Sequence, residues 1–259
     1  MEVNASINTM IGIFDSGSGG MSVFKEIVRL LPEEKYVYFS DNAHCPYGEK
    51  TAAYIQDRAR HIAALLIGKG CRIIVVACNT ATAAAIRTLR EEFPETPFIG
   101  MEPAVKPAAL GTKTGVIGVL ATAGTLKGSK YLNTRGLYQD DVRIIEHVGE
   151  GFVELVEKGI FSGPEAEETV GKSLRPLLEE GADTIVLGCT HYPFLRDTIQ
   201  SIAGDDVRII DPAPAVARQT RKIMIERELC DPSGYGIEIL SSGDPASVSR
   251  IYDLVKPEP

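Results

Sequence analysis

Short apolar stretches alternate with longer amphipathic stretches along most of the chain. Four β-branched residues precede Ala77 and Cys78 in IIVVACNTATA, residues 73–83, and a similar run precedes Cys189 in TIVLGCTHYP, residues 184–193. A continuous apolar run bounded by turn residues is typical of a strand buried on both faces, whereas apolar residues at helical spacing indicate a helix packed on a sheet. The alternation predicts an α/β protein made of βαβ units with mainly parallel sheets.

The first part of the chain contains seven expected elements. Strands are expected at 10–16, 35–41, 71–77 and 96–101, and helices at 23–31, 51–70 and 80–93. The pattern then restarts, with strands expected at 113–122, 142–148 and 184–188 and helices at 152–159 and 164–181. The tail adds an apolar run at 207–210, a helical pattern after it, an expected edge strand at 236–244 and a last helix at 244–255.

The restart of the pattern suggests that the chain contains two copies of one half-domain. Thr122 takes the place of Ser16, and Cys189 takes the place of Cys78 at a similar separation. We therefore expect two pseudo-symmetric three-layer α/β/α domains with an active site in the cleft between them. The first domain is expected to be discontinuous, with residues 10–103 plus 208–259, and the second is expected at 104–207.

Composition and charge narrow the class of protein. The chain has 259 residues and a formal net charge of −8, which disfavours a nucleic-acid partner. No apolar run approaches the roughly 20 residues of a membrane span. Residues 1–10 show no pattern of a secretory signal, and we expect them to form a loose leader. The five cysteines have no CxxC spacing, so reduced thiols in the cytoplasm are expected.

Polar residues and cysteines follow several of the expected strands. Ligands of parallel α/β sheets bind at the carboxyl ends of the strands. The side chains expected there are Asp15, Ser16, Asp41, Cys78, Asn79, Thr80, Thr122, Cys189, Thr190 and His191. If the two halves face each other, one thiol lies on each side of a single substrate.

Each of these features also has a simpler interpretation. A cysteine at a strand end is often an inert buried residue. The DSGSGG loop either forms only a tight turn or binds an anion, and it lacks the G-x-G-x-x-G spacing of a dinucleotide site. Asp15 could cap a helix, and His191 could be structural. Zinc at Cys78, Cys189, His191, His44 and Cys45 is not expected, because none of them has the short spacing of zinc ligands.

Five motifs together resemble the glutamate racemases of the cofactor-independent aspartate/glutamate racemase superfamily. They are GIFDSGSGG, DNAHCPYGEK, VVACNTATA, VLATAGT and LGCTHYP. The resemblance implies that Cys78 and Cys189 are the catalytic acid/base pair, Cys78 deprotonating D-glutamate and Cys189 L-glutamate. It also implies supporting roles for Asp15, His191 and Glu157. The substrate would contact Asp15, Ser16, Tyr47, Gly48, Asn79, Thr80, Thr122, Thr190 and His191.

The resemblance further implies an isomerase that needs no cofactor and no metal, and that supplies D-glutamate for peptidoglycan synthesis. A homodimer is expected, and a peptidoglycan precursor activates some members. The chain departs from the family around Glu157, where EHVGEGFVELVEKG lacks a Cys-Pro pair that the family often has. Cys45, directly before the PYG stretch, receives no role because the family varies there.

The chemistry of inversion explains why two thiols are useful. Inverting an α-carbon means removing a proton from one face and adding a proton to the other, so two groups on opposite faces are needed. A thiol serves as both acid and base because its pKa of about 8.5 lies near neutral pH. Two alternatives remain at this point: a racemase of another α-acid such as aspartate, and a non-catalytic module that binds an amino acid.

Overall fold

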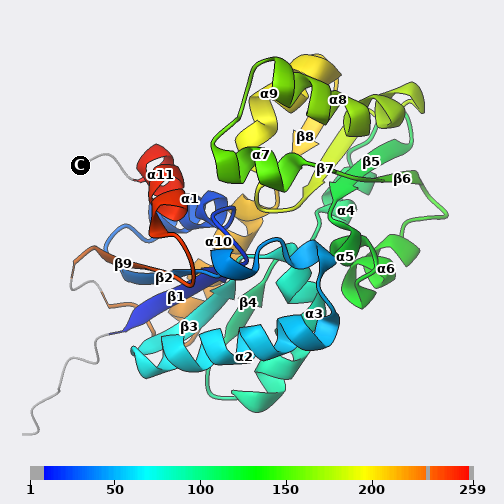
Figure 1. Cartoon of the computed structure of the whole chain (residues 1–259). Coiled ribbons are helices and arrows are strands. Elements are labelled where there is room, and N and C mark those ends of the chain that lie inside the picture. Colours follow the sequence, from blue (N-terminus) through cyan, green and yellow to red (C-terminus); the bar gives the residue numbers. More distant parts are fainter. Residues whose placement is uncertain (1–8, 232–233, 257–259) are drawn as a thin grey trace, which may run out of the picture.

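The described residues, 9–231 and 234–256, form two parallel sheets in this computed structural model (Figure 1). The first sheet has the strand order β4-β3-β1-β2-β9, with β1 at Met10–Asp15, β2 at Lys35–Ser40, β3 at Cys71–Val76, β4 at Phe98–Gly100 and β9 at Gly236–Ser241. The second has the order β6-β5-β7-β8, with β5 at Val116–Ala121, β6 at Arg143–Val148, β7 at Thr184–Gly188 and β8 at Arg208–Ile210. Every pair of neighbouring strands is parallel.

The two sheets repeat one topology. In the first, β1 lies between β2 and β3, with β4 beyond β3. In the second, β5 lies between β6 and β7, with β8 beyond β7. The predicted fold class is confirmed, and the equivalence relates β3, which leads to Cys78, to β7, which leads to Cys189.

The position of β8 corrects one predicted boundary. We expected the chain to return to the first domain at residue 208, but Arg208–Ile210 pairs with β7 in the second sheet. The repeated topology explains this pairing, because β8 is the counterpart of β4 and completes the second sheet. The return comes later, when β9 pairs with β2 as the expected edge strand.

Helices cover both faces of the first sheet. They are α1 (Met21–Leu30), α2 (Ala52–Gly68), α3 (Asn79–Glu92), α10 (Ala213–Glu226) and α11 (Pro245–Val255). Alternate residues of β3 enter different cores: Ile73 and Val75 pack in the cluster that contains α1, α10 and α11, whereas Ile74 and Val76 pack in the cluster that contains α2 and α3. Burial on both faces explains why these strands are continuous apolar runs.

The second sheet is also enclosed by helices. They are α4 (Val105–Ala109), α5 (Ala123–Leu126), α6 (Ser129–Gly136), α7 (Phe152–Lys158), α8 (Pro164–Glu179) and α9 (Arg196–Ala203). Leu120 and Leu187 pack with α7, α8 and α9, whereas Val119 and Val186 pack with α4 and α6. Three short 3-10 helices, Asn42–His44, Tyr47–Glu49 and Tyr192–Leu195, follow β2 and β7.

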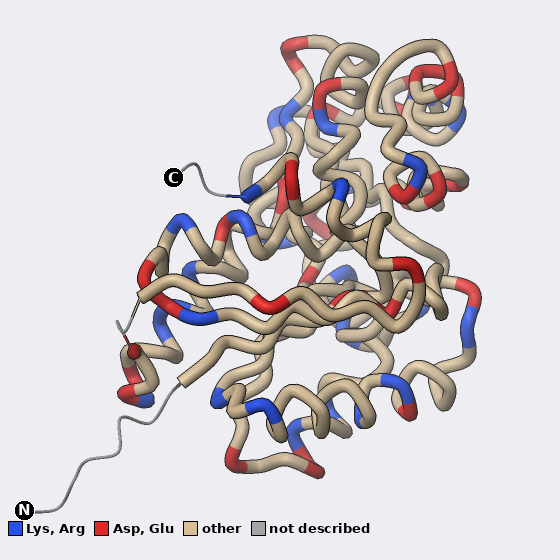
Figure 2. Tube along the Cα trace, turned by 60° about the vertical axis from the view of Figure 1, so that its left-hand side comes forward, with Lys and Arg blue, Asp and Glu red and all other residues tan. Residues whose placement is uncertain are grey.

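Charge is spread over the outer helices, where basic and acidic residues alternate, while the strands carry few charges (Figure 2). Among the described residues, no helix has the length and apolar character needed to cross a membrane. Most of the expected leader, residues 1–8, lies outside the described residues.

Candidate active site

The two cysteines occupy equivalent places in the two halves. Cys78 follows β3 and is the N-cap residue of α3, and Cys189 directly follows β7. Both side chains are buried, with 5% and 8% exposure respectively. The repeat therefore places one thiol from each half at the carboxyl end of its sheet.

The Cys78 thiol is held by its own helix and by the glycine-rich loop. The backbone N–H of Ala81 donates to Sγ at 3.4 Å, and Sγ donates to the Ser16 hydroxyl at 3.7 Å. Burial raises the pKa of Cys78 above its usual value, the negative charge of Asp15 raises it further, and these two hydrogen bonds partly oppose the shift. A helix N-cap accepts the N–H that lies three residues further on, so Ala81, and neither Asn79 nor Thr80, supports this thiol.

The Cys189 thiol lies next to a buried imidazole. Its Sγ is 3.8 Å from Nδ1 of His191, and Nε2 of His191 is 2.7 Å from Oε1 of Glu157 on α7. The same carboxylate oxygen accepts the backbone N–H of Ser18 at 2.7 Å. A thiol, an imidazole and a carboxylate therefore form a chain that ends on the glycine-rich loop of the other half.

Electrostatics favour the charged form of this imidazole. Burial alone would lower the pKa of His191, but the hydrogen bonds to Cys189 and Glu157 outweigh it and raise the pKa well above its usual value. Burial also opposes ionisation of Glu157, yet the contacts with His191 and Ser18 lower the pKa of this carboxyl. Both shifts favour the pairing of an imidazolium with a carboxylate, although Glu157 is only partly enclosed, with its side chain 19% exposed.

Asp15 organises the glycine-rich loop from the end of β1. Its Oδ2 accepts the backbone N–H of Gly20 at 2.9 Å and that of Gly17 at 3.3 Å. Burial raises the pKa of Asp15, while the charge of His191 and these N–H groups act in the opposite direction. Asp15 thus orders the loop that leads into α1, but the first turn of that helix has no side-chain cap, so the capping role considered from the sequence is wrong.

Hydroxyl groups join the two halves across the cleft. Ser22 donates to the carbonyl of Thr190 at 2.9 Å, and the hydroxyls of Thr80 and Thr122 are 2.9 Å apart. The Thr190 hydroxyl donates to Asp15 at 3.5 Å. Four of the predicted substrate contacts, Asp15, Thr80, Thr122 and Thr190, thus also link the two halves.

The side chain of Asn79 is buried without a hydrogen-bond partner at either its oxygen or its nitrogen. Buried amide groups in proteins are nearly always satisfied, so an unpaired one beside a catalytic candidate points to a ligand. Asn79 is the first residue of α3, directly after Cys78. This observation supports its predicted place in the substrate site.

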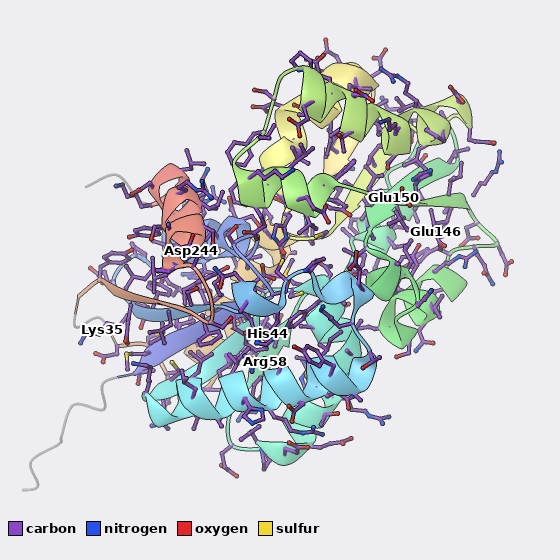
Figure 3. All side chains as sticks on the ribbon, viewed as in Figure 1. Lys35, His44, Arg58, Glu146, Glu150 and Asp244 are labelled. Atoms are coloured by element: carbon purple, nitrogen blue, oxygen red, sulfur yellow. The ribbon has the colours of Figure 1, made fainter. Side chains whose placement is uncertain are left out.

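Tyr47 and Gly48 are held in place by different contacts. The Tyr47 hydroxyl donates to Asp41, which is also held by Arg58 of α2 at 2.6 Å (Figure 3 labels Arg58). Burial opposes ionisation of Asp41, but Arg58 and Tyr47 lower the pKa of its carboxyl. The proton of the Tyr47 hydroxyl is therefore already engaged by Asp41. Gly48 packs closely against Thr122. A Cβ atom on Gly48 would lie 3.2 Å from the Cβ atom of Thr122, which is closer than an ordinary van der Waals contact.

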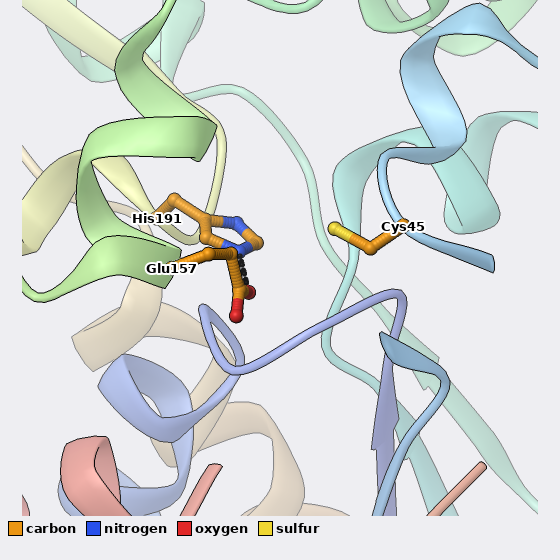
Figure 4. A group of neighbouring side chains, drawn as sticks. All are labelled: Cys45, Glu157 and His191. Carbon is orange, nitrogen blue, oxygen red and sulfur yellow. Dashed lines mark hydrogen bonds and ion pairs between the residues drawn. The ribbon is translucent and has the colours of Figure 1, made fainter. Parts of the chain in front are cut away.

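One group of side chains near the cleft has donor atoms suited to a metal ion. Atoms of Cys45, Glu157 and His191 lie within 4.8 Å of one another (Figure 4). Cys78, Cys189 and His44, which we also considered from the sequence, are not part of this group.

The comparison with known proteins decides the family. The profile of the Asp/Glu/Hydantoin racemase family matches residues 11–220. The chain belongs to this family. The glutamate racemase of Stutzerimonas stutzeri is 46% identical over 245 residues, which cover 95% of this chain and 93% of that protein.

Solved structures of the same family have the same fold. A glutamate racemase isoform of Bacillus anthracis superposes with a TM-score of 0.86 and 32% identity, covering 96% of this chain and 94% of the other. The Escherichia coli glutamate racemase, solved with L-glutamate and the activator UDP-MurNAc-Ala, superposes with a TM-score of 0.84 and 32% identity, again covering 96% and 94%.

Sequence reasoning about this racemase-family chain missed several residues near the cleft. Ser18 binds Glu157 through its backbone N–H, which a sequence pattern does not reveal. Arg58 gives a weak signal, because a half-buried arginine within an amphipathic helix suggests a buried acidic partner, here Asp41. Cys45 was noticed but received no role, and its neighbours Glu157 and His191 are far away in sequence.

Gly19 offers a stability test of the packing between loop and imidazole. A Cβ atom on Gly19 would lie 2.2 Å from Nδ1 of His191. Because that ring is buried and held at both nitrogens, we expect Gly19→Ala to lower the free energy of unfolding by about 1–3 kcal/mol. Denaturant titration measures the change.

Gly68→Ala is the matched control, because a Cβ at this exposed end of α2 meets nothing within 4 Å. We expect it to be neutral or to stabilise the protein by about 0.5–1 kcal/mol. Equal stability of Gly19→Ala and the wild type would show that the loop does not pack against His191.

Proposed function

We propose that this protein interconverts L-glutamate and D-glutamate with Cys78 and Cys189 as the two proton-transfer groups. One observation carries the proposal: two buried thiols follow equivalent strands of two repeated halves, and hydrogen bonds between Thr80 and Thr122 and between Thr190 and Asp15 join the halves beside them. Two equivalent groups on opposite sides are what inversion of a carbon centre requires. The similarity to glutamate racemases over 95% of the chain supports glutamate as the substrate.

In the proposed reaction, one cysteine as thiolate takes the α-proton and the other, as thiol, delivers a proton to the opposite face. The protonation states of the two cysteines are exchanged after each turnover. His191, 3.8 Å from Cys189, and Asp15, whose charge acts on Cys78, are placed to return each thiol to its starting state. Burial raises the pKa of Cys78 and so favours its thiol in the free protein, and the α-ammonium group of a bound substrate would favour its thiolate.

Substrate binding is assigned to the polar groups that line the cleft. The unpaired amide of Asn79 offers both a donor and an acceptor to the α-amino-acid group. The Ser16 and Thr122 hydroxyls and the Tyr47–Gly48 backbone amides are proposed to hold the two carboxylates, together with Thr80, Thr190 and His191. Fixed donors in a water-poor site stabilise the carbanion without a cofactor.

The wider setting belongs to the same proposal. We assign the two sheets to two domains, with the second extended to Ile210, and place the protein in the cytoplasm, where two reactive thiols stay reduced. A homodimer and a role in supplying D-glutamate for peptidoglycan follow from the family resemblance. The activator in the Escherichia coli structure suggests that a nucleotide-linked peptidoglycan precursor acts on this protein too.

The test is optical activity of amino acids incubated with the purified protein. L-Glutamate and D-glutamate should both approach zero circular dichroism, and activity should survive prior treatment with a chelator. If only aspartate loses optical activity, the substrate assignment is wrong. If neither changes while calorimetry shows binding of glutamate, the protein is a binding module and the reaction is absent.

The ion pair at His191 leads to a prediction on pH dependence. Glu157 helps to raise the pKa of His191, so Glu157→Gln should lower that pKa. The imidazolium of the variant should then lose its proton at a lower pH than that of the wild type. We expect the alkaline limb of kcat/KM to move to lower pH, with a maximal rate reduced about tenfold, less than the 10²–10⁴-fold typical for loss of a whole acid–base group. Initial rates between acidic and alkaline buffers measure both effects.

The same linkage acts on stability. A histidine with a raised folded-state pKa stabilises the fold fully below its unfolded pKa, and this contribution is lost as pH rises through the folded value. Glu157→Gln should therefore lose stability relative to the wild type between the lowered pKa of Glu157 and the raised pKa of His191, a window that includes neutral pH. The difference should shrink at lower pH, where Glu157 of the wild type is protonated, and at higher pH, where His191 is neutral. Glu154→Gln, an exposed change on the same helix, is the control. An unshifted pH profile in Glu157→Gln would limit this glutamate to a structural role.

A further inference from the structure

Cys45, Glu157 and His191 come from three separate segments and converge beside the glycine-rich loop. Cys45 follows the 3-10 helix after β2, Glu157 lies on α7, and His191 follows β7. A Cβ atom on Gly17 would lie 2.3 Å from Oε1 of Glu157 and 3.1 Å from Sγ of Cys45, so both side chains close over the same glycine. Figure 4 shows the Cys45 sulfur directed toward the side of the imidazole.

The donor set matches one class of ion. A thiolate, an imidazole and a carboxylate are the three kinds of ligand that Zn²⁺ takes, and three protein ligands leave a fourth position for water. With zinc bonds of about 2.0–2.3 Å, tetrahedral ligand atoms lie about 3.5 Å apart, so atoms spread over 4.8 Å need to close by about 1 Å. Rotation of the Cys45 and Glu157 side chains supplies such a movement, since both are only partly buried.

The charges around the cluster favour a cation. Asp15 and Glu157 are the nearby carboxyl groups, and His191 is the positive group that faces them. A hollow of about 310 Å³ leads to the cluster and is lined by Cys45 and Glu157 together with the acidic residues Glu154 and Asp244. No lysine or arginine lines it among the described residues. Asp244 is labelled in Figure 3. A divalent cation thus has an acidic route to the cluster.

We propose that Cys45, Glu157 and His191 form an inhibitory binding site for Zn²⁺ or a similar thiol-binding divalent cation. Binding releases the thiol proton of Cys45 and the imidazolium proton of His191 to solvent. The imidazole then holds the metal and no longer exchanges a proton with Cys189. The ion is a regulator of the proposed racemase and takes no part in its reaction.

Zinc binding is measured directly, so the result does not depend on racemase activity. Metal-free protein is dialysed against Zn²⁺ with a phosphine reductant, and bound zinc is determined by elemental analysis. We expect one zinc per chain in the wild type and in Cys230→Ser, which removes an exposed thiol outside the cleft. In Cys45→Ala the affinity should fall by more than about 100-fold, because loss of residues that only orient a ligand already costs 10–100-fold.

Inhibition and spectroscopy complete the test. Zinc should inhibit racemisation in the wild type at the concentrations at which it binds, and Cys45→Ala should keep its activity there. Co²⁺ in place of zinc should give a thiolate charge-transfer band that Cys45→Ala lacks. If Cys45→Ala folds poorly, Cys45→Ser provides the same comparison with a hydroxyl of similar size.

Two results would overturn the site. Wild-type affinity for zinc in Cys45→Ala would mean that Cys45 is not a ligand of the metal and that the proposed site does not exist. Absence of stoichiometric zinc from the wild type at saturating concentration would mean that the three side chains do not close on an ion. Either result would leave the proposed racemase reaction untouched.

Discussion

Cys78→Ala and Cys189→Ala should each abolish the interconversion of L- and D-glutamate, with a loss of at least about 10²–10⁴-fold, the range measured for loss of a positioned acid or base. Each direction of the reaction uses one cysteine as base and the other as acid. A protein with one thiol therefore lacks a partner in both directions. Circular dichroism of the amino acid measures the rate.

The fold should survive these substitutions. Each removes one buried sulfur atom, and we expect a loss of about 1 kcal/mol, comparable to a small truncation in a core. Cys71→Ala is the matched control for Cys78, because Cys71 is buried at the opposite end of the same strand and burial raises its pKa to about 12. Near-normal racemisation by either single mutant would exclude a mechanism with two cysteines.

Much of the fold was predictable because burial leaves a simple pattern. Strands enclosed on both faces, such as β3 and β7, are continuous apolar runs ended by polar residues. The repeat was visible because the two halves place similar residues at equivalent strand ends. The assignment of β8 to the first domain was wrong because a three-residue strand is too short to show a periodic pattern. Its pairing with β7 depends on which sheet has an unpaired edge strand nearby, and the sequence does not reveal this.

The candidate site was predictable in part for a related reason. Residues at or just after the end of a strand, such as Asp15 and Cys78, reach the site because parallel strands all end at one edge of the sheet. The hydrogen-bond partners were not predictable, since the geometry of the α3 N-terminus gives Cys78 the N–H of Ala81. The neighbours Cys45 and Glu157 meet only through tertiary structure, and spacing rules for metal ligands do not detect such a pair.

The final prediction assigns a substrate face to each cysteine. The family resemblance implies that Cys78 deprotonates D-glutamate and Cys189 deprotonates L-glutamate. A serine in place of one cysteine leaves the other thiol able to remove a proton. With glutamate analogues that carry a leaving group on the β-carbon, proton removal is followed by elimination and needs no second acid. Cys189→Ser should therefore process the D-analogue and lose the L-analogue, and Cys78→Ser should do the reverse.

Isotope exchange in D₂O tests the same geometry in the wild type. If the two thiols act on opposite faces, the product carries deuterium from the acid-side thiol, while recovered substrate stays largely protiated in the first turnovers. A single mobile base would return substrate hydrogen to the product and place deuterium in unreacted substrate. If both serine variants prefer the same enantiomer, the assignment of faces is wrong. If each variant accepts both enantiomers equally, neither thiol is confined to one face, and the equivalent positions of Cys78 after β3 and Cys189 after β7 do not determine the stereochemistry.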